Sequence, residues 1–405
     1  MTTTMTTTLL KGLRALDLTG PIGDSCGRIL AGFGVEVIRV DSPAARSSVT
    51  AGELTRWRAG NLDKRSITLD IESDAGRELF MRLAADSQFV IESFTPGYLS
   101  QLRLDYAALS QLNPRIILVS ISPFGQAGPY SQYKGGELIA AAMNGVLITL
   151  GDPDRPPVKE ALDANCFHGS AAAALGAVMA HYHRQRTGVG QHVDLSIQEA
   201  GVSRNTNNVL LWQFDKRCVQ RGGPFLRFGK ASIRCVWKLS DGYTFYSMAT
   251  GRFGAPANRA LTAWMNELRY DNPMREVDWD RYDRATLDAE VRNTWEAAIA
   301  RFFADRTKAQ IASEGRRRGI NAAVANEIAD LLNDPQLNAR GYLVETPWPQ
   351  GNEPVRVPDY FVRSNQSAAA HRVPDHPGQD NAAIYGGLLG LSAGDLDALA
   401  GRGTI

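Results

Sequence analysis

The feature that most constrains this chain is an alternation of short apolar runs with helical patterns between residues 14 and 121. The runs are nearly continuous in apolar residues, as expected of strands buried on both faces of a parallel sheet. They read RALDL (14–18), EVIRV (36–40), SITLDI (66–71), QFVIE (88–92) and RIILVSI (115–121). Segments with helical periodicity, such as DAGRELFMRLAAD, lie between them. The alternation predicts a doubly wound, Rossmann-like α/β domain.

The character of the sequence changes after about residue 215. Before it, Ser170–Arg186 is predicted to be a helix that stops at Gly188, and QHVDLSI a further strand. After it, SIRCVWKLSDGYTFYSM alternates around an Asp-Gly pair, which is typical of a β-hairpin. Charge-rich helical sequence follows to about residue 330. We expect a smaller α+β domain here, with Trp237, Tyr243 and Tyr246 in its core.

Composition and spacing exclude several classes of protein. The 44 Lys and Arg residues nearly balance the 43 Asp and Glu residues, so nothing indicates a nucleic-acid or membrane partner. The four cysteines form no CxxC pair, the first turn lacks the GxGxxG spacing, and HYH (181–183) has poor metal-ligand geometry. The start of the chain lacks a signal-peptide pattern, and its most apolar stretch is too short to span a bilayer. We expect a soluble, cytoplasmic protein without a bound metal.

The stretch LDANCFHG before the alanine-rich helix concentrates reactive residue types. It contains Asp163, Asn165, Cys166 and His168. A carboxylate at a helix N-terminus would make a suitable nucleophile, because the helix dipole stabilises the anion. Cys166 and His168 are only two residues apart, whereas a Cys–His hydrolase brings these groups together from separate places, so a packing role is favoured.

Four stretches carry a resemblance to a known family: LLKGLRALDLTGPIGDSCGRILAGFGVEVIRVD, NLDKRSITLDI, VIESFTPGYLSQLRLDYAALSQLNPRIILVSISPFGQAGPY and RQRTGVGQHVDLSIQEA. With the closing LGLSAGDLDAL they resemble the class III CoA-transferases, the family of formyl-CoA transferase, over essentially the whole chain. The resemblance implies a large Rossmann-like, CoA-binding domain from residues 1–203 and 335–405 and a small domain from 225–330. Linkers would span 204–224 and 331–334, and two subunits would interlock like links.

The resemblance also implies a reaction. In this family an aspartate attacks an acyl-CoA thioester to form a mixed anhydride. CoA thiolate then attacks the anhydride, and the resulting aspartyl-CoA thioester passes CoA to a second acid. The family pattern places the aspartate four residues before a glycine that opens the alanine-rich helix. Counting back four residues from Gly169 gives Asn165, whose uncharged amide cannot form the anhydride at a useful rate.

Four explanations of Asn165 stay open on the sequence alone. The chain is a naturally non-catalytic subunit whose partner carries the aspartate, or Asn165 is an engineered substitution that traps a complex. Alternatively, Asp163 takes over after a shift in register, or Asn165 simply caps the helix. Gly136 stands beside Glu137 where formyl-CoA transferase has a tyrosine, and Ala141 where many relatives have a glutamine. These departures favour the first explanation. The family's racemases have a histidine in the place of Gly136, so racemisation is disfavoured.

The resemblance assigns CoA as a substrate, not as a tightly bound cofactor. The expected nucleotide contacts are Asn61, Lys64, Arg65, Ser93, Phe94 and Lys134. In this family a glycine-rich loop covers the active site of the opposite subunit, and RGGPFLRFG matches it with Arg221, Gly222, Gly223 and Arg227. The two arginines are suited to pair with a substrate carboxylate, because guanidinium groups bind carboxylates in a bidentate manner.

The sequence therefore predicts one subunit of a CoA-transferase, inactive in isolation, with a homologous partner that carries the catalytic aspartate. The substrates would be an acyl-CoA such as succinyl-CoA and a dicarboxylic acid such as (R)-benzylsuccinate, as in a heteromeric branch of the family that serves anaerobic toluene degradation. The alternatives are a homodimeric transferase with an Asp-to-Asn change at position 165 and a non-enzymatic acyl-CoA-binding protein.

Overall fold

The computed structural model describes residues 9–46, 50–228, 231–349, 351, 353–362 and 371–405. The chain forms two compact units, one from Met1–Leu147, Lys159–Cys218 and Pro335–Ile405 and one from Ile148–Val158 and Val219–Asp334. The expected boundaries differ from this division in several stretches. Residues 148–158, expected in the large domain, belong to the smaller unit, and residues 204–218, expected to be a linker, belong to the larger one. The expected linker residues 219–224 and 331–334 also belong to the smaller unit.

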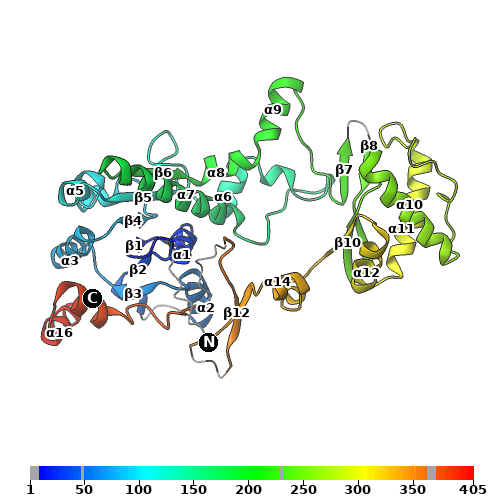
Figure 1. The fold of residues 1–405 in the computed structure, drawn as a ribbon. Coiled ribbons are helices and arrows are strands. Elements are labelled where there is room, and N and C mark those ends of the chain that lie inside the picture. The colour runs from blue at the N-terminus through cyan, green and yellow to red at the C-terminus, as the bar shows by residue number, and fades with distance from the viewer. Residues whose placement is uncertain (1–8, 47–49, 229–230, 350, 352, 363–370) are drawn as a thin grey trace. The chain divides into compact units, whose positions relative to one another are not determined.

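The larger unit is built on a sheet of six parallel strands in the order β3-β2-β1-β4-β5-β6 (Figure 1), and it also holds the antiparallel pair β12-β13. The strands are β1 Arg14–Leu18, β2 Glu36–Asp41, β3 Arg65–Thr68, β4 Phe89–Glu92, β5 Ile117–Ser122 and β6 His192–Ser196. The predicted doubly wound α/β fold is confirmed. The strand order reverses between β1 and β4, and the carboxyl ends of strands at such a switch point are where open α/β sheets bind ligands.

Each face of this sheet carries its own apolar core. On one face, alternate strand residues pack with α1 Asp24–Gly32 and α7 Ala164–Thr187. On the other face they pack with α3 Asp74–Ala85, α5 Tyr106–Leu112 and the C-terminal segment. Because both faces are covered, the strands carry apolar side chains at nearly every position, which is the pattern that identified them in the sequence.

The C-terminal segment returns to the edge of the sheet at β3. The backbone N–H of Asp380 donates to the carbonyl of Ser66, and the Tyr385 hydroxyl donates to the carbonyl of Thr68 at 2.7 Å. Tyr385 is fully buried. The helices of this segment are η3 Ala382–Gly386, α15 Gly387–Leu389 and α16 Ala393–Gly401. The larger unit is thus completed by both ends of the chain.

The remaining elements of the larger unit connect the strands or extend from them. They are η1 Pro43–Arg46, α2 Ala51–Gly60, α4 Tyr98–Gln101, α6 Glu137–Met143, η2 Leu147–Thr149, α8 Ile197–Arg204, α9 Thr206–Asp215, α14 Pro335–Ala339, β12 Leu343–Thr346 and β13 Val355–Pro358; η2 runs on into the smaller unit. None of the helices in the described ranges combines the length and apolar character that a membrane span requires.

The smaller unit has an aromatic core under a short antiparallel sheet. The predicted hairpin is confirmed as β9 and β10, which pair on either side of Ser240 and Asp241, with Gly242 already paired to Leu239. Trp237 and Tyr246 lie in the core as expected, but the expectation for Tyr243 was wrong, because its side chain lies on the opposite face of β10 and is exposed. The elements are β7 Phe225–Phe228, β8 Ala231–Arg234, β9 Val236–Leu239, β10 Gly242–Tyr246, β11 Ala322–Ala325, α10 Gly251–Glu267, α11 Ala289–Ala304, α12 Lys308–Arg318 and α13 Ile328–Leu331.

Candidate active site

Helix α7 begins at Ala164, six residues before the predicted start. Its first backbone N–H groups are satisfied by a carboxylate from another helix. The N–H of Asn165 donates to Glu137 Oε1 at 3.1 Å, and the N–H of Cys166 donates to Glu137 Oε2 at 2.9 Å. Glu137 is the first residue of α6 and is buried. The hypothesis that Asn165 caps α7 is therefore wrong: Asp163 occupies the N-cap position, and Asn165 lies inside the first turn.

The Asn165 amide is held in one orientation. Its Nδ2 donates to Glu137 Oε1 at 2.5 Å, and its Oδ1 accepts from Asn144 Nδ2 at 2.9 Å and from Arg204 Nη1 at 3.4 Å. The side chain is 1% exposed. An ionised carboxylate only accepts hydrogen bonds, so Glu137 requires a donor at this position. The surroundings of residue 165 therefore suit an amide better than a second carboxylate.

Asp163 lies two residues earlier and is engaged elsewhere. Its carboxylate pairs with Arg56 Nη2 at 2.6 Å and with Lys159 Nζ at 3.2 Å, and its side chain is substantially exposed. It makes no side-chain hydrogen bond to the start of α7. The structure therefore gives no support to a shift in register that would bring Asp163 into the place of Asn165.

Cys166 follows Asn165 but is not an activated nucleophile. Burial raises the pKa of its thiol to about 12, and the neighbouring Glu137 carboxylate adds to the increase. The reactive form of cysteine is the thiolate, which is scarcely populated at neutral pH with such a pKa. No described hydrogen bond links Cys166 to His168, in keeping with the packing role inferred for these residues.

Two charged residues of this site were missed in the sequence. Arg204, in the last turn of α8, reaches Asn165 with one nitrogen and pairs with Glu160 Oε1 through the other at 3.1 Å. Glu160 Oε2 is buried and accepts no hydrogen bond among the described residues. Neither residue lies in a motif, so no local signal identifies them. The site thus contains a cation at the amide and, paired with that cation, a carboxylate with one unsatisfied oxygen.

Gly136 leaves open space beside this site. A Cβ atom placed on Gly136 would meet no other atom within 4 Å, so the backbone here tolerates a side chain that this chain lacks. Ala141, one turn into α6, is buried. Neither position supplies a polar group to the start of α7.

A cavity of about 520 Å³ opens at the switch point of the sheet. Ser93 and Phe94, two of the expected CoA contacts, line it. Asn61 lines a neighbouring cavity of about 300 Å³, which shares Thr19 to Pro21 and Arg39 with the first and extends to Arg56 beside Asp163. The structure thus brings three of the six expected contacts to adjoining cavities near the start of α7.

The other expected CoA contacts lie elsewhere. Lys64 is fully buried, and its Nζ donates to Asp17 Oδ2 and to the Asp24 carbonyl, both at 2.7 Å. It has no exposed surface with which to meet a ligand. Arg65 pairs with Glu36 at 3.1 Å. Lys134 is exposed and lines neither of these cavities.

The glycine-rich loop is anchored to residues 148–155 of the smaller unit. The guanidinium of Arg221 donates to three backbone carbonyls, those of Ile148, Asp152 and Arg155, at 3.0–3.2 Å. Gly223 has φ +54°, and a Cβ there would lie 2.5 Å from Asp152 Oδ1, so glycine is favoured at this position. Gly222 also approaches the backbone closely, at Phe225. The side chain of Arg227 lies outside the described residues.

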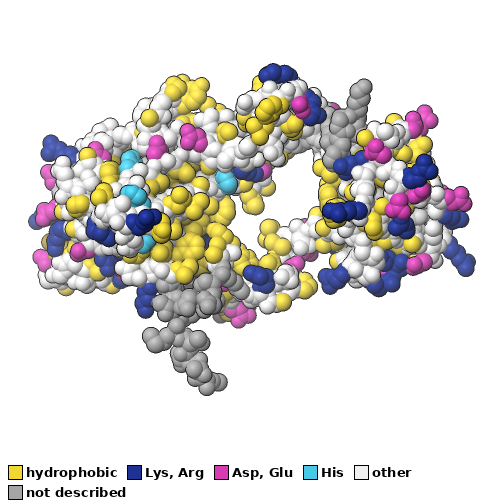
Figure 2. Space-filling model, turned by 45° about the horizontal axis from the view of Figure 1, so that its top comes forward, with side chains coloured by type: hydrophobic (Ala, Val, Ile, Leu, Met, Phe, Trp, Pro, Cys, Tyr) yellow, Lys and Arg dark blue, Asp and Glu magenta, His cyan; other side chains and the backbone are white. Residues whose placement is uncertain are grey.

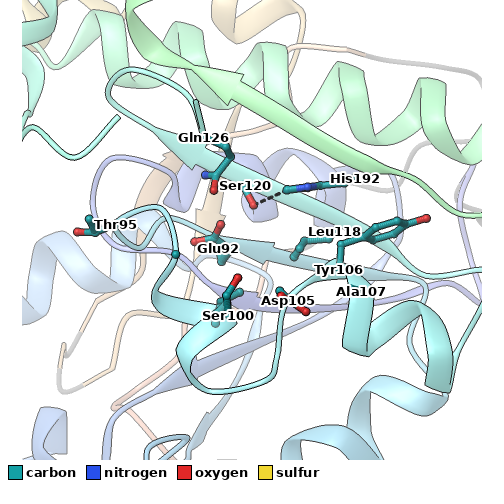
Figure 3. Close-up of a pocket in the computed structure, with 12 residues that line it drawn as sticks. Glu92, Thr95, Ser100, Asp105, Tyr106, Ala107, Leu118, Ser120, Gln126 and His192 are labelled. Atoms are coloured by element: carbon teal, nitrogen blue, oxygen red, sulfur yellow. Dashed lines mark hydrogen bonds between the residues drawn. The ribbon is translucent and has the colours of Figure 1, made fainter. Parts of the chain in front are cut away.

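A second hollow of about 260 Å³ lies beside the last residue of β4, the middle of β5 and the first residue of β6 (Figure 3). Ser120 Oγ and His192 Nε2 are 2.9 Å apart, and the buried Glu92 carboxyl faces the same space. Burial raises the pKa of Glu92 to about 7. Hydrogen bonds from the Ser120 hydroxyl and the Phe94 N–H partly offset this shift, whereas the nearby Asp194 adds to it. No Lys or Arg lines this hollow.

We expect Glu92→Gln to stabilise the larger unit at pH 8 but not at pH 4. Because the pKa of Glu92 is raised, the folded state favours the protonated side chain. The resulting contribution to the free energy of unfolding is fully present below pH 4.5 and is lost as the pH rises from about 4.5 to 7. Glutamine stays neutral throughout, so the variant should gain about 2–3 kcal/mol relative to wild type across that window. Denaturant unfolding at both pH values measures this, with the exposed Glu78→Gln as control. A difference that does not change with pH would contradict the assignment.

The fold and the α7 site define the class to which this chain belongs. The sequence matches CoA-transferase family III over residues 10–381, and the chain belongs to that family. It is 30% identical over 341 residues to the BbsE subunit of succinyl-CoA:(R)-benzylsuccinate CoA-transferase from Thauera aromatica, covering 81% of this chain and 82% of that one. It is 28% identical to succinyl-CoA–D-citramalate CoA-transferase from Chloroflexus aurantiacus, with 98% of each chain covered.

Solved structures agree with this placement. The fold is similar to that of a CaiB/BaiF family protein from Brucella suis, with a TM-score of 0.77 and 26% sequence identity. The similarity covers 94% of this chain and 99% of that one.

Proposed function

We propose that this chain is the subunit of a heteromeric class III CoA-transferase that does not supply the nucleophile. One observation carries the proposal: the residue at the place of the family's aspartate is an amide whose Nδ2 donates to Glu137. Formation of the anhydride requires an anion at this place. Here the anion at the helix N-terminus is Glu137, and the amide is its hydrogen-bond donor.

Glu137 is not suited to replace the missing aspartate. Both of its oxygens accept backbone N–H groups of α7, and one of them also accepts from Asn165. A carboxylate held by three donors is a poor nucleophile, because the hydrogen bonds stabilise the anion relative to the product of attack. The nucleophile of the proposed reaction therefore comes from a homologous partner.

The proposed substrates are succinyl-CoA and a dicarboxylic acid. Two relatives, one of them the BbsE subunit, bear names that give succinyl-CoA as a substrate, with (R)-benzylsuccinate in one case and D-citramalate in the other. We propose the same class for this chain, with CoA entering only as a substrate. Arg204, which lies within reach of Asn165, is a cation in a position to contact such an acid.

The surface of the larger unit supports a partner subunit. Helix α7 exposes Phe167, Leu175, Met179 and Tyr182, spaced three to eight residues apart along one side of the helix. Helix α9 exposes further apolar residues, among them Trp212 and Phe214. Figure 2 shows a broad patch of hydrophobic side chains on the larger unit. Exposed apolar surface of this extent is typical of interaction sites, and we propose that the two subunits interlock through it.

Co-purification with a homologue tests this function. The partner is a family member from the same source with an aspartate four residues before the helix glycine. We expect the two chains to form a complex that transfers CoA from succinyl-CoA to a dicarboxylic acid, and replacing the partner's aspartate with alanine should abolish turnover. If this chain formed no such complex and turned over substrate alone, the proposed division of roles would be wrong.

A further inference from the structure

The switch-point cavity has a well-defined shape and lining. It lies where loops leave the carboxyl ends of β1, β2 and β4 and the end of β3, and sixteen residues line it. Phe94 and Tyr98 form one wall, with ring centroids 4.6 Å apart. The Tyr98 hydroxyl donates to Glu72 Oε1 at 2.8 Å, which fixes that ring. An aromatic wall in a cavity of this size suits a flat heterocyclic base, because stacking on aromatic faces is favourable for any base.

The charges in this cavity are mostly negative. Three carboxylates line it, those of Asp41, Asp70 and Glu72, against one cation, Arg39. Arg39 is already engaged: Nε and Nη2 donate to Asp41 Oδ1 at 2.9 and 2.5 Å, and Nη1 donates to the carbonyl of Thr19. Its side chain is 11% exposed. Among the lining residues, no cation is therefore free to bind a phosphate group.

Two of the carboxylates keep accepting capacity. Asp70 uses Oδ1 to accept the N–H of Glu72, and Glu72 uses Oε1 to accept the Tyr98 hydroxyl. Their second oxygens accept no hydrogen bond within the described residues. Carboxylates near a base-stacking wall are suited to accept the hydroxyls of a ribose, as acidic residues do in dinucleotide-binding folds. A phosphate group on that ribose would instead meet like charge.

We propose that this cavity binds a nucleoside with free ribose hydroxyls and rejects CoA, whose ribose carries a 3′-phosphate and whose chain begins with a diphosphate. The base lies against Phe94 and Tyr98, and the hydroxyls donate to Asp70 and Glu72. It follows that in the complex CoA is bound by the partner alone. This last step rests on the proposed two-subunit enzyme, whereas the preference for a nucleoside does not.

Titration calorimetry on the full chain tests the preference directly. Adenosine, dephospho-CoA and CoA are titrated separately at low salt. We expect adenosine to bind and CoA to bind at least about tenfold more weakly, with dephospho-CoA between them. Raising the salt concentration should reduce the difference, because salt screens the repulsion. Failure of adenosine to bind at millimolar concentration, or tighter binding of CoA than of adenosine, would overturn the proposal.

A charge reversal separates a local effect from net charge. Glu72→Lys should strengthen CoA binding by about tenfold or more and weaken adenosine binding, because it exchanges a repulsive group for a phosphate partner. Glu78→Lys makes the same change in net charge on α3 but outside the cavity, and should alter neither affinity by more than about twofold. Equal effects of the two variants on CoA binding would contradict a site at Glu72. Binding is measured without turnover, so these results do not depend on whether the proposed enzyme is correct.

Discussion

Replacing Asn165 with aspartate is expected to leave the isolated chain without ordinary CoA-transferase turnover and to destabilise its larger unit. The new carboxylate oxygen would replace Nδ2, which lies 2.5 Å from Glu137 Oε1. Two buried carboxylates at this distance cannot both ionise, so one pKa of the pair is raised. Each unit of that increase costs about 1.4 kcal/mol of stability above the raised pKa. Turnover should stay below about 1% of the roughly 1–1000 per second usual for enzymes.

A second substitution provides the matched control. In the double variant Asn165→Asp with Glu137→Gln, the glutamine amide can donate to the new aspartate, so donor and acceptor are exchanged and the charge is unchanged. We expect this variant to regain only part of the stability lost by Asn165→Asp, as measured by denaturant unfolding at pH 8, because the glutamine NH2 group that donates to the new aspartate no longer accepts the backbone N–H of residue 165. Full activity of Asn165→Asp alone at an ordinary rate would instead show that the asparagine replaces a native aspartate in an otherwise competent site.

Lys64→Met should destabilise the larger unit by about 3–5 kcal/mol, the usual effect of removing one partner from a buried ion pair. Lys64 and Asp17 are both fully buried, and Asp17 would keep only the more distant Arg39, at 3.7 Å, as a counter-charge. The surroundings cannot relax easily, because Gly27 of α1 is so close that an added Cβ would lie 2.1 Å from Asp17 Oδ2.

The neighbouring Arg65 gives a control for this prediction. Its ion pair with Glu36 is about one-third exposed on both sides, so Arg65→Ala should change stability by only about 0–1 kcal/mol. The double variant Lys64→Met with Asp17→Asn should recover part of the loss, since no unpaired charge stays buried. Similar stability of Lys64→Met and wild type would show that Lys64 is not structural and would return it to the set of ligand contacts.

The sheet was predictable from the sequence because its strands are buried on both faces. Short apolar runs rich in β-branched residues, such as Ile117–Ser122, favour buried strands when they alternate with longer helical patterns. The start of α7 was not predictable in the same way. Asp163 contributes no side-chain cap, and the capping carboxylate comes from Glu137, which lies 28 residues before the N–H that it accepts. No local pattern reports such a contact.

The same limit applies to the charged residues. In NLDKRS, Lys64 and Arg65 are adjacent and look equally exposed, yet one is fully buried against Asp17 and the other lies at the surface. The partner of Lys64 is 47 residues away in the sequence. Arg221 was expected to bind a substrate carboxylate, but its guanidinium donates to three carbonyls of a loop that precedes it by about 70 residues. The sequence therefore predicts which residues are charged, but the group with which each charge pairs is known only from the fold.

Exchange of labelled succinate into succinyl-CoA by the purified, homogeneous chain tests the central claim most directly. The exchange needs only a nucleophile that opens the thioester and returns CoA to the same acid, so it does not depend on knowing the acceptor. Because residue 165 is an amide and Glu137 is fully engaged, we predict no exchange above the uncatalysed rate, with exchange appearing when the aspartate-bearing partner is added. Appreciable exchange by this chain alone would contradict the account.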